Sequence, residues 1–383
     1  MDDPRVIIAI IFLLVILFVV IYGRWRVHHP LPTNSPPELL WRLLTLSPPN
    51  NTAYDALLHK AYDAYEAGEL ELAEQQFTEA ISAQPGNVEA YYRRAYIRAK
   101  QKKFSEAAED FSRALEIEPE HLQTHLLQSA MLIYDQQEYT QAIDNLNKAI
   151  EFARSQHRKH VDYGVYISST EKWHSAVTDQ LSRLLYLRAV AYSMVKQNEQ
   201  AIADYSELID LNESSTENKA ELHVQRGHLF LAQGSYAAAR QDFDTALKAD
   251  ESSVRAYDGR AAVFYHQGDY QQAVHYWTQA ISLEPDTAML YNNRGEARFA
   301  AACYEDALAD FEKALELQPV SRHAQAGKAI AQYMLGSEAD ARAVWQQLIA
   351  DDARYGDINA VADDLRWATP LTEAARKLNQ SLD

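Results

Sequence analysis

The sequence predicts an all-α protein, a superhelical solenoid of about eight helix–turn–helix repeats behind an N-terminal transmembrane helix. An uncharged apolar run fills residues 6–22, and a pattern with a period of 34 residues occupies most of the chain after it. Few stretches show the alternation typical of strands. Repeats of this length that cannot bury their apolar faces alone must stack on one another, which favours a solenoid over separate globular domains.

The apolar run Val6–Tyr22 is expected to be an uncleaved membrane anchor within residues 1–27. Its 17 residues would span ~26 Å as a helix, close to the hydrocarbon thickness of a bilayer. The alternative is a cleaved signal peptide. The leader MDDPR is not basic, the run exceeds the usual ~7–15 residues, and no A-x-A-like site follows. These features favour the anchor, with Trp25 at the membrane interface.

The charges beside the run predict its orientation. Arg24 and Arg26 follow it, whereas Arg5 alone precedes it. Lysine and arginine residues are retained on the cytoplasmic side of a membrane. We therefore expect a single-pass membrane protein with its C-terminal solenoid in the cytoplasm.

Residues 28–53 are expected to form a semi-stiff linker because they are rich in proline. The prolines are Pro30, Pro32, Pro36, Pro37, Pro48 and Pro49. Ser35 and Glu38 have the spacing of a capping box before the apolar stretch LLWRLLTL. The short helix predicted there either lies on the membrane or caps the first repeat.

The repeat keeps its packing residues and varies its surface. Unit starts fall near Tyr54, Val88, Gln123, Ser182, Ala220, Val254, Ala288 and Arg322. Unit position 20 is alanine in all eight units, and position 24 is bulky in all eight. Glycine marks position 15 in four units, and proline stands at position 32 in four. Each unit is therefore predicted to be two antiparallel helices, with a turn at position 15 and a helix stop before the proline.

These features resemble the tetratricopeptide repeat family over residues 54–355, with repeats one to three in 54–154 and four to eight in 182–355. The arrangement is also similar to that of membrane-anchored bacterial repeat proteins such as lipopolysaccharide-assembly protein B. The rubredoxin-like module of that protein needs paired cysteines, and this chain has Cys303 alone.

The resemblance implies that the first helices of the units line a concave groove. Its residues would lie at unit positions 2, 5, 9, 12 and 13. Carried over to this chain, the partner-binding candidates are Tyr62, Tyr65, Tyr92, Tyr96, Tyr134, Tyr186, His228, Asp258, Tyr265, Asn292, Phe299 and Tyr333. A wall rich in tyrosine suits an extended peptide or a docked helix, although some of these side chains could instead pack between helices. The two-carboxylate clamp for chaperone tails needs a basic residue at position 5 and asparagine at position 9, and no unit has either.

Arginine at unit position 7 suggests either an anion-binding stripe or pairing inside the repeats. Positions 7 and 23 are equidistant from the turn, so they should face each other. The pairs are Arg94 with Asp110, Arg188 with Asp204, Arg226 with Asp242 and Arg294 with Asp310, while Arg260 faces Tyr276. This match favours internal pairing.

Two segments interrupt or end the array. Residues 155–181 are an insertion, in which the stretch 155–179 is a candidate contact site with a basic patch of Arg154, Arg158 and Lys159. A helix from Glu171 into unit four is expected, capped by Ser169 or Thr170. Residues 356–383 are expected to form two polar-faced capping helices, with Thr369 as the cap of the second.

Composition and motifs favour a protein that binds a protein partner over one that binds nucleic acid or catalyses a reaction. The net charge of −18 argues against nucleic-acid partners. No catalytic motif occurs, and the repeats leave no room for a catalytic domain. No enzyme activity, cofactor, metal or small-molecule substrate is expected.

The expected function is that of a membrane-anchored scaffold or adaptor, which binds a protein or peptide in the assembly or regulation of a membrane-associated complex. The alternatives are a non-catalytic regulatory subunit of an enzyme carried by another chain, and an extracytoplasmic envelope assembly factor.

Overall fold

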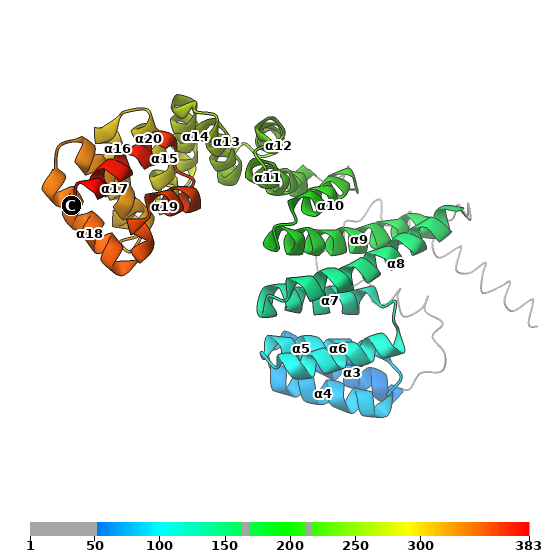
Figure 1. Cartoon of the computed structure of the whole chain (residues 1–383). Coiled ribbons are helices and arrows are strands. Elements are labelled where there is room, and N and C mark those ends of the chain that lie inside the picture. Colours follow the sequence, from blue (N-terminus) through cyan, green and yellow to red (C-terminus); the bar gives the residue numbers. More distant parts are fainter. Residues whose placement is uncertain (1–51, 163–167, 212–215, 383) are drawn as a thin grey trace, which may run out of the picture.

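The fold is an all-helical solenoid, as the sequence predicts. The computed structural model describes residues 52–162, 168–211 and 216–382 (Figure 1). Within these ranges the chain contains helices and no strand. No helix in the described ranges is both long and apolar enough for a membrane crossing. The predicted anchor and the predicted linker helix lie outside the described residues.

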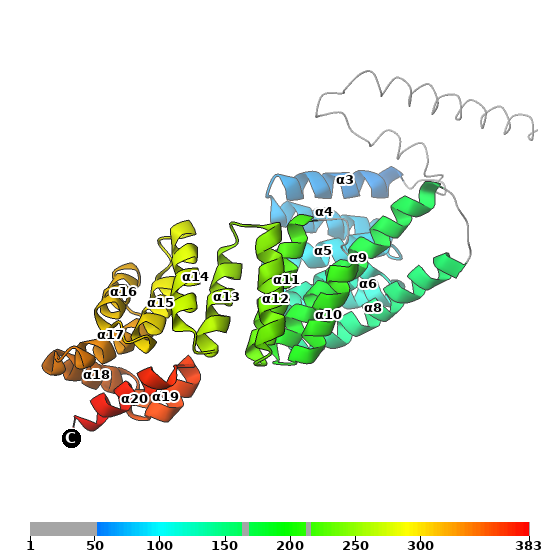
Figure 2. The same ribbon diagram turned by 90° about the horizontal axis from the view of Figure 1, so that it is seen from above.

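The helices form consecutive antiparallel pairs along the chain. The first four pairs are α3 (Thr52–Glu66) with α4 (Leu70–Ala83), α5 (Val88–Lys100) with α6 (Phe104–Ile117), α7 (Leu122–Met131) with α8 (Tyr139–Asp162), and α9 (Ser168–Met194) with α10 (Asn198–Leu211). The next four are α11 (Thr216–Ala232) with α12 (Tyr236–Ala249), α13 (Val254–His266) with α14 (Tyr270–Leu283), α15 (Ala288–Ala300) with α16 (Tyr304–Leu317), and α17 (Arg322–Met334) with α18 (Glu338–Asp351). Figures 1 and 2 show the pairs following one another from α3 to α18.

Each turn between paired helices places unit position 15 in the left-handed backbone region. Four units use glycine there, with φ of 80° at Gly68, 75° at Gly234, 82° at Gly268 and 86° at Gly336. The other four use residues with a side chain: Lys102, Gln137, Lys196 and Ala302, at φ of 59° to 62°. The turn geometry is thus common to all eight units, although glycine marks it in only half of them.

Proline ends the second helix where the sequence places it at position 32. Helix α14 stops at Leu283, two residues before Pro285, and α16 stops at Leu317, two residues before Pro319. Because a proline disfavours helical backbone in the residue before it, the helix ends just ahead of it. The chain then turns into the next first helix.

The bulky residue at position 24 sits in the interior between repeats. The eight side chains are Phe77, Phe111, Leu146, Tyr205, Phe243, Trp277, Phe311 and Trp345, and each is at most 3% exposed. Phe243 lies between Gly227 of its own unit and Gly259 of the next, where an added Cβ would approach the ring to 2.8 Å and 2.3 Å. Phe243 therefore limits how closely the first helices of its own repeat and of the next can approach. We call the bulky side chain at position 24 the wedge.

Much of the insertion extends the helices on either side of it, α8 and α9. Helix α8 continues to Asp162, and α9 begins at Ser168, earlier than the expected start at Glu171, and runs on into unit four as predicted. Arg154, expected in a free basic patch, instead forms an ion pair with Glu207 of α10.

The chain ends in η2 (Ala353–Gly356), α19 (Ile358–Leu365) and α20 (Thr369–Gln380). We call residues 357–382 the C-terminal segment. Ala368, not Thr369, occupies the N-cap position of α20 and makes no side-chain cap bond. The face of α20 that packs on the array is apolar, with Leu371, Ala375 and Leu378 fully buried. The segment covers apolar surface at the end of the array with this face, as a capping element does.

Replacing Ala302 by glycine should stabilise the protein. Ala302 is exposed and held at a φ of 61°, which costs an L-residue roughly 1–2 kcal/mol. Glycine removes that strain, less an unfolded-state entropy loss of about 0.4–1 kcal/mol, so we expect a net gain of ~0.5–1 kcal/mol. Thermal unfolding of Ala302→Gly and of the matched Gly268→Ala should shift in opposite directions. A fall in melting temperature for Ala302→Gly would contradict the strain argument.

Candidate partner-binding groove

Tyrosines from the first helices of repeats one to four form the candidate site. We call Tyr62, Tyr65, Tyr96, Tyr134 and Tyr186 the tyrosine groove. The hydroxyls of Tyr65 and Tyr96 lie 3.3 Å apart, and their rings meet edge to face with centroids 5.9 Å apart. Neighbouring repeats thus place tyrosines side by side across α3 and α5.

Arg93 lies in the middle of this surface, stacked between two rings. Its guanidinium carbon is 5.2 Å from the centroid of Tyr62 and 4.9 Å from that of Tyr92. Its Nε donates to Glu89 at 3.0 Å, and the Tyr62 hydroxyl donates to the same carboxylate at 2.5 Å. The Arg93 side chain is still 38% exposed, so a cation supported by aromatic faces is presented to a partner.

The charge state of Glu89 follows from these contacts. Burial disfavours its ionised form, but the Tyr62 hydroxyl bond and the nearby Arg93 charge outweigh burial and lower the pKa of this carboxyl. Glu89 is therefore an anion matched to Arg93. The ion pair and the two rings hold the Arg93 guanidinium in place.

Tyr134 is the most exposed aromatic residue of the groove. It lies in η1 (Leu132–Gln136), a π-helical turn at the end of α7, and is 60% exposed. Such turns re-aim side chains and often occur at functional sites. Tyr186 of α9 is half-buried and meets Tyr205 edge to face, with centroids 6.3 Å apart.

The structure separates the twelve predicted site residues into two groups. Tyr134 is exposed, and Tyr62, Tyr65, Tyr96, Tyr186, His228, Asp258 and Tyr333 are half-buried. Tyr92, Tyr265, Asn292 and Phe299 are buried, with exposures of 4%, 6%, 5% and 2%. The expectation that these four line an open groove is wrong, and the partner-binding role of the others stays a prediction.

Three of the buried side chains, Tyr92, Phe299 and Tyr265, are covered by identifiable residues. His121 lies against the Tyr92 ring at a centroid distance of 4.8 Å, and Tyr304 lies 5.0 Å from Phe299. Tyr265 is covered by the C-terminal segment, whose Ala368 N–H donates to the Tyr265 hydroxyl at 2.9 Å. This last cover comes from a residue far along the chain, so spacing within a repeat could not indicate it.

The polar groove candidates in repeats five and six make internal contacts. Asp258 accepts a hydrogen bond from Trp277 Nε1 at 2.7 Å. His228 packs edge to face on Phe243 at 5.1 Å, and burial lowers the pKa of its imidazole. His228 and Asp258 are therefore used in contacts inside the array, whereas Tyr134, the one exposed candidate, lies in repeat three.

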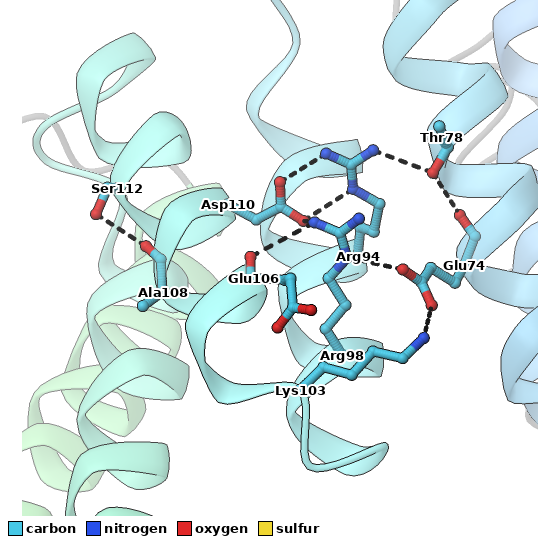
Figure 3. A network of polar contacts seen from close by, with 9 residues as sticks. All are labelled: Glu74, Thr78, Arg94, Arg98, Lys103, Glu106, Ala108, Asp110 and Ser112. Carbon is cyan, nitrogen blue, oxygen red and sulfur yellow. Dashed lines mark hydrogen bonds and ion pairs between the residues drawn. The ribbon is translucent and has the colours of Figure 1, made fainter.

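The arginines at position 7 pair within their repeats, as predicted. Arg94 donates from Nε and Nη2 to both oxygens of Asp110, at 2.8 Å and 2.6 Å (Figure 3). The same bidentate hydrogen bonds join Arg188 to Asp204, Arg226 to Asp242 and Arg294 to Asp310. Arg260 stacks on Tyr276 at 4.4 Å. These guanidinium groups are used internally and do not form an anion site.

Each of these arginines also contacts the preceding repeat, a feature that the sequence pattern did not reveal. Arg94 Nη1 donates to Thr78 at 3.0 Å, and Figure 3 shows the arginine bridging the two repeats. The corresponding acceptors are Asn147 for Arg188, Ser206 for Arg226, Asp244 for Arg260 and Thr278 for Arg294. All stand at unit position 25. We call this series of contacts the arginine ladder.

The fold and the groove together define a class of protein, a helical repeat scaffold. Models of the tetratricopeptide repeat match residues 88–121, and also residues 186–254, 224–274, 259–302 and 294–356. These stretches cover more than half of the chain. The chain belongs to the tetratricopeptide repeat family, whose repeats mediate protein or peptide binding.

Similar proteins share the repeats over part of their length. The chain is 27% identical over 118 residues to DnaJ homolog subfamily C member 3 of Gallus gallus, which is 30% of this chain and 22% of that protein. It is 34% identical over 92 residues to sperm-associated antigen 1 of Rattus norvegicus, 24% of this chain and 10% of that protein. The chain thus spans under a quarter of either relative.

A solved tetratricopeptide repeat protein from Parabacteroides merdae is 19% identical, with a TM-score of 0.42 over 86% of this chain and 100% of that one.

Removing the carboxylate that pairs with an arginine at position 7 should destabilise the protein markedly. Asp310 is 3% exposed and accepts bonds from Arg294 and, at 2.7 Å, from Arg298. Asp310→Ala leaves two partly buried cations without their partner, which should cost ~3–5 kcal/mol.

The control on the same helix is Glu316→Ala. Its pair with Lys313 is exposed and should contribute under about 1 kcal/mol. Thermal unfolding followed by circular dichroism measures both variants. Equal shifts in melting temperature would show that the pairing of Asp310 with Arg294 and Arg298 does not stabilise the protein.

Proposed function

We propose that this protein is a single-pass membrane-anchored scaffold that binds a segment of another protein in its tyrosine groove. By holding that segment it assembles or regulates a complex at the membrane surface. The observation that carries the proposal is the set of tyrosines in repeats one to four, of which Tyr134 is exposed and the others are half-buried, together with the partly exposed Arg93. These repeats are also the first to follow the apolar run in the sequence.

The chemistry of the groove favours a peptide or helix over other ligands. Tyrosine rings offer apolar faces, and their hydroxyls offer hydrogen bonds at the edge of the same contact. Tyrosine and arginine are enriched where protein interfaces are most tightly bound. Among the described residues no group of three His, Cys, Asp or Glu side chains could hold a metal ion. The tyrosines and Arg93 therefore suit the groove to recognition of a protein segment.

The linker limits where the partner can lie. Between Tyr22 and the start of α3 at Thr52 stand 29 residues, which extend at most ~100 Å. A partner bound in the groove is then a membrane protein or a protein held near the membrane. The order of anchor and repeats, which resembles anchored bacterial repeat proteins, supports this reading.

Replacing three groove tyrosines should abolish partner capture. We expect Tyr65→Ala, Tyr96→Ala and Tyr134→Ala together to lower the affinity at least about tenfold, because interface tyrosines typically contribute ~1–2 kcal/mol or more each. In-cell crosslinking, membrane purification and mass spectrometry would compare the triple variant with wild type.

Leu72→Ala is the matched control, because Leu72 is 42% exposed on α4, a second helix outside the groove. A discrete partner retained by this control and lost from the triple variant supports the groove. Recovery of the same partners from all three proteins would contradict the proposed site.

The orientation is tested separately with reporters fused after Asp383. We expect a fluorescent protein that matures in the cytoplasm to be active, and alkaline phosphatase, which needs an oxidising compartment, to be inactive. Changing Arg24 and Arg26 to glutamate should shift the reporters toward the opposite pattern, because it removes the positive charges that retain this side. Activity of the phosphatase fusion alone in the wild-type chain would contradict the cytoplasmic placement and favour an envelope assembly factor.

A further inference from the structure

The C-terminal segment folds back along the concave side of the last three repeats. Helix α20 contacts α18, as a cap would, but it also contacts α17 and α15, the first helices of repeats eight and seven. Ala368 reaches repeat six, where its N–H donates to the Tyr265 hydroxyl. Figures 1 and 2 show α19 and α20 beside α15 and α17. The segment thus lies where a groove ligand would lie.

Apolar side chains of the segment join the core of the groove. Trp367 is 8% exposed, and Leu371, Ala375 and Leu378 are fully buried in one cluster with Phe299 and Ile330. Leu371, Ala375 and Leu378 stand at i, i+4 and i+7, a spacing that places them on one face of α20, and Trp367 lies just before that helix. An amphipathic helix that begins just after a tryptophan is therefore what this surface receives.

The floor of the groove beneath the tryptophan is polar and buried. Glu296 is 6% exposed and forms an ion pair with His323, and Asn292 Nδ2 donates to Glu296 at 3.1 Å. Burial disfavours protonation of His323, but the adjacent Glu296 outweighs burial and raises the pKa of this imidazole. The indole nitrogen of Trp367 lies 3.3 Å from His323 Nε2.

Two features of this region bear on how tightly the segment is held. The Oδ1 atom of Asn292 is buried and has no hydrogen-bond partner, a state that carries a desolvation penalty. Arg366, at the joint between α19 and α20, has a φ of 53°, which is strained for a residue with a side chain. A ligand that offers a donor to Asn292 and needs no such joint would bind better.

We propose that the concave face of repeats six to eight is a second binding site, for an amphipathic helix preceded by a tryptophan, and that the chain's own C-terminal segment occupies it as an internal ligand. A helix of the same pattern on a partner protein displaces the segment. The part of α20 that touches the last repeat keeps its capping role, since Trp345 Nε1 donates to Asn379 at 3.2 Å. This site is independent of the tyrosine groove in repeats one to four.

The test measures binding of a free copy of the segment to the full-length chain in lipid nanodiscs. The probe is a fluorescent peptide of residues 364–382. Wild-type protein should bind it weakly, because the internal copy has the higher effective concentration. Trp367→Ala weakens the internal copy and leaves the groove intact, so this variant should bind the peptide at least tenfold more tightly. A peptide with alanine in place of its tryptophan should bind neither protein.

A third protein places the binding in this groove. Adding Glu296→Ala to Trp367→Ala removes the partner of His323 from the floor and should abolish the gain. If the folded Trp367→Ala chain binds no peptide, or binds it as weakly as wild type does, the proposal is overturned. Equal binding with and without Glu296→Ala would overturn it as well.

A milder variant keeps the proposal testable if Trp367→Ala unfolds. Tyr265→Phe removes only the acceptor of the Ala368 N–H. Hydrogen exchange of the amides in 358–380 should then quicken several-fold, while exchange in α5 and α6 stays the same. The matched control is Tyr355→Phe, whose ring packs on Trp345, 6.0 Å away, on the capping side. Unchanged exchange in Tyr265→Phe would show that the segment is a permanent part of the array.

Discussion

The bulky side chain at unit position 24 is the constraint on which the rest of the structure depends. It is buried in every repeat, and Phe243 and Phe311 each lie between the first helix of their own unit and that of the next. Glycine at 227 and 259 around Phe243, and at 295 and 327 around Phe311, shows how little space remains, because a single added methyl would meet the ring at 2.3–2.9 Å. Interiors packed to this density do not deform smoothly. The wedge therefore fixes the spacing of the first helices, and that spacing creates the groove.

The same constraint explains how the array ends. Trp345 is the wedge of repeat eight, and the residues that pack on it come from the C-terminal region and not from another first helix. The C-terminal segment supplies the cover through Asn379, and Tyr355 packs on the indole edge to face. Once α20 is held there, its other end extends along α17 and α15 and reaches Tyr265. Closing the end of the solenoid thus also closes the groove of the last repeats and leaves the tyrosines of the first repeats as the open surface.

Interactions inside one unit were predictable from the sequence, and those between distant segments were not. The pairing of Arg94 with Asp110 follows from two positions equidistant from a turn, and the structure confirms it. The acceptors at position 25 could not be predicted from the repeat pattern, because threonine, asparagine, serine and aspartate all accept the bond from the arginine of the next repeat. The left-handed turn at Lys102 lacks the glycine that would have marked it. The burial of Tyr265 depends on Ala368, 103 residues away, and a repeat pattern holds no information about that contact.

The arginine ladder determines how the two ends of the groove can influence each other. Each rung joins a repeat only to the one before it, so the array is held together by nearest-neighbour contacts. Rungs at Arg188, Arg226 and Arg260 stand between the tyrosine groove and the site beneath Trp367. Release of the C-terminal segment would uncover new surface in repeats six to eight without changing the backbone that holds Tyr65, Arg93 and Tyr96. Two ligands could then be held by one chain, and any coupling between them would arise from a partner long enough to reach both sites.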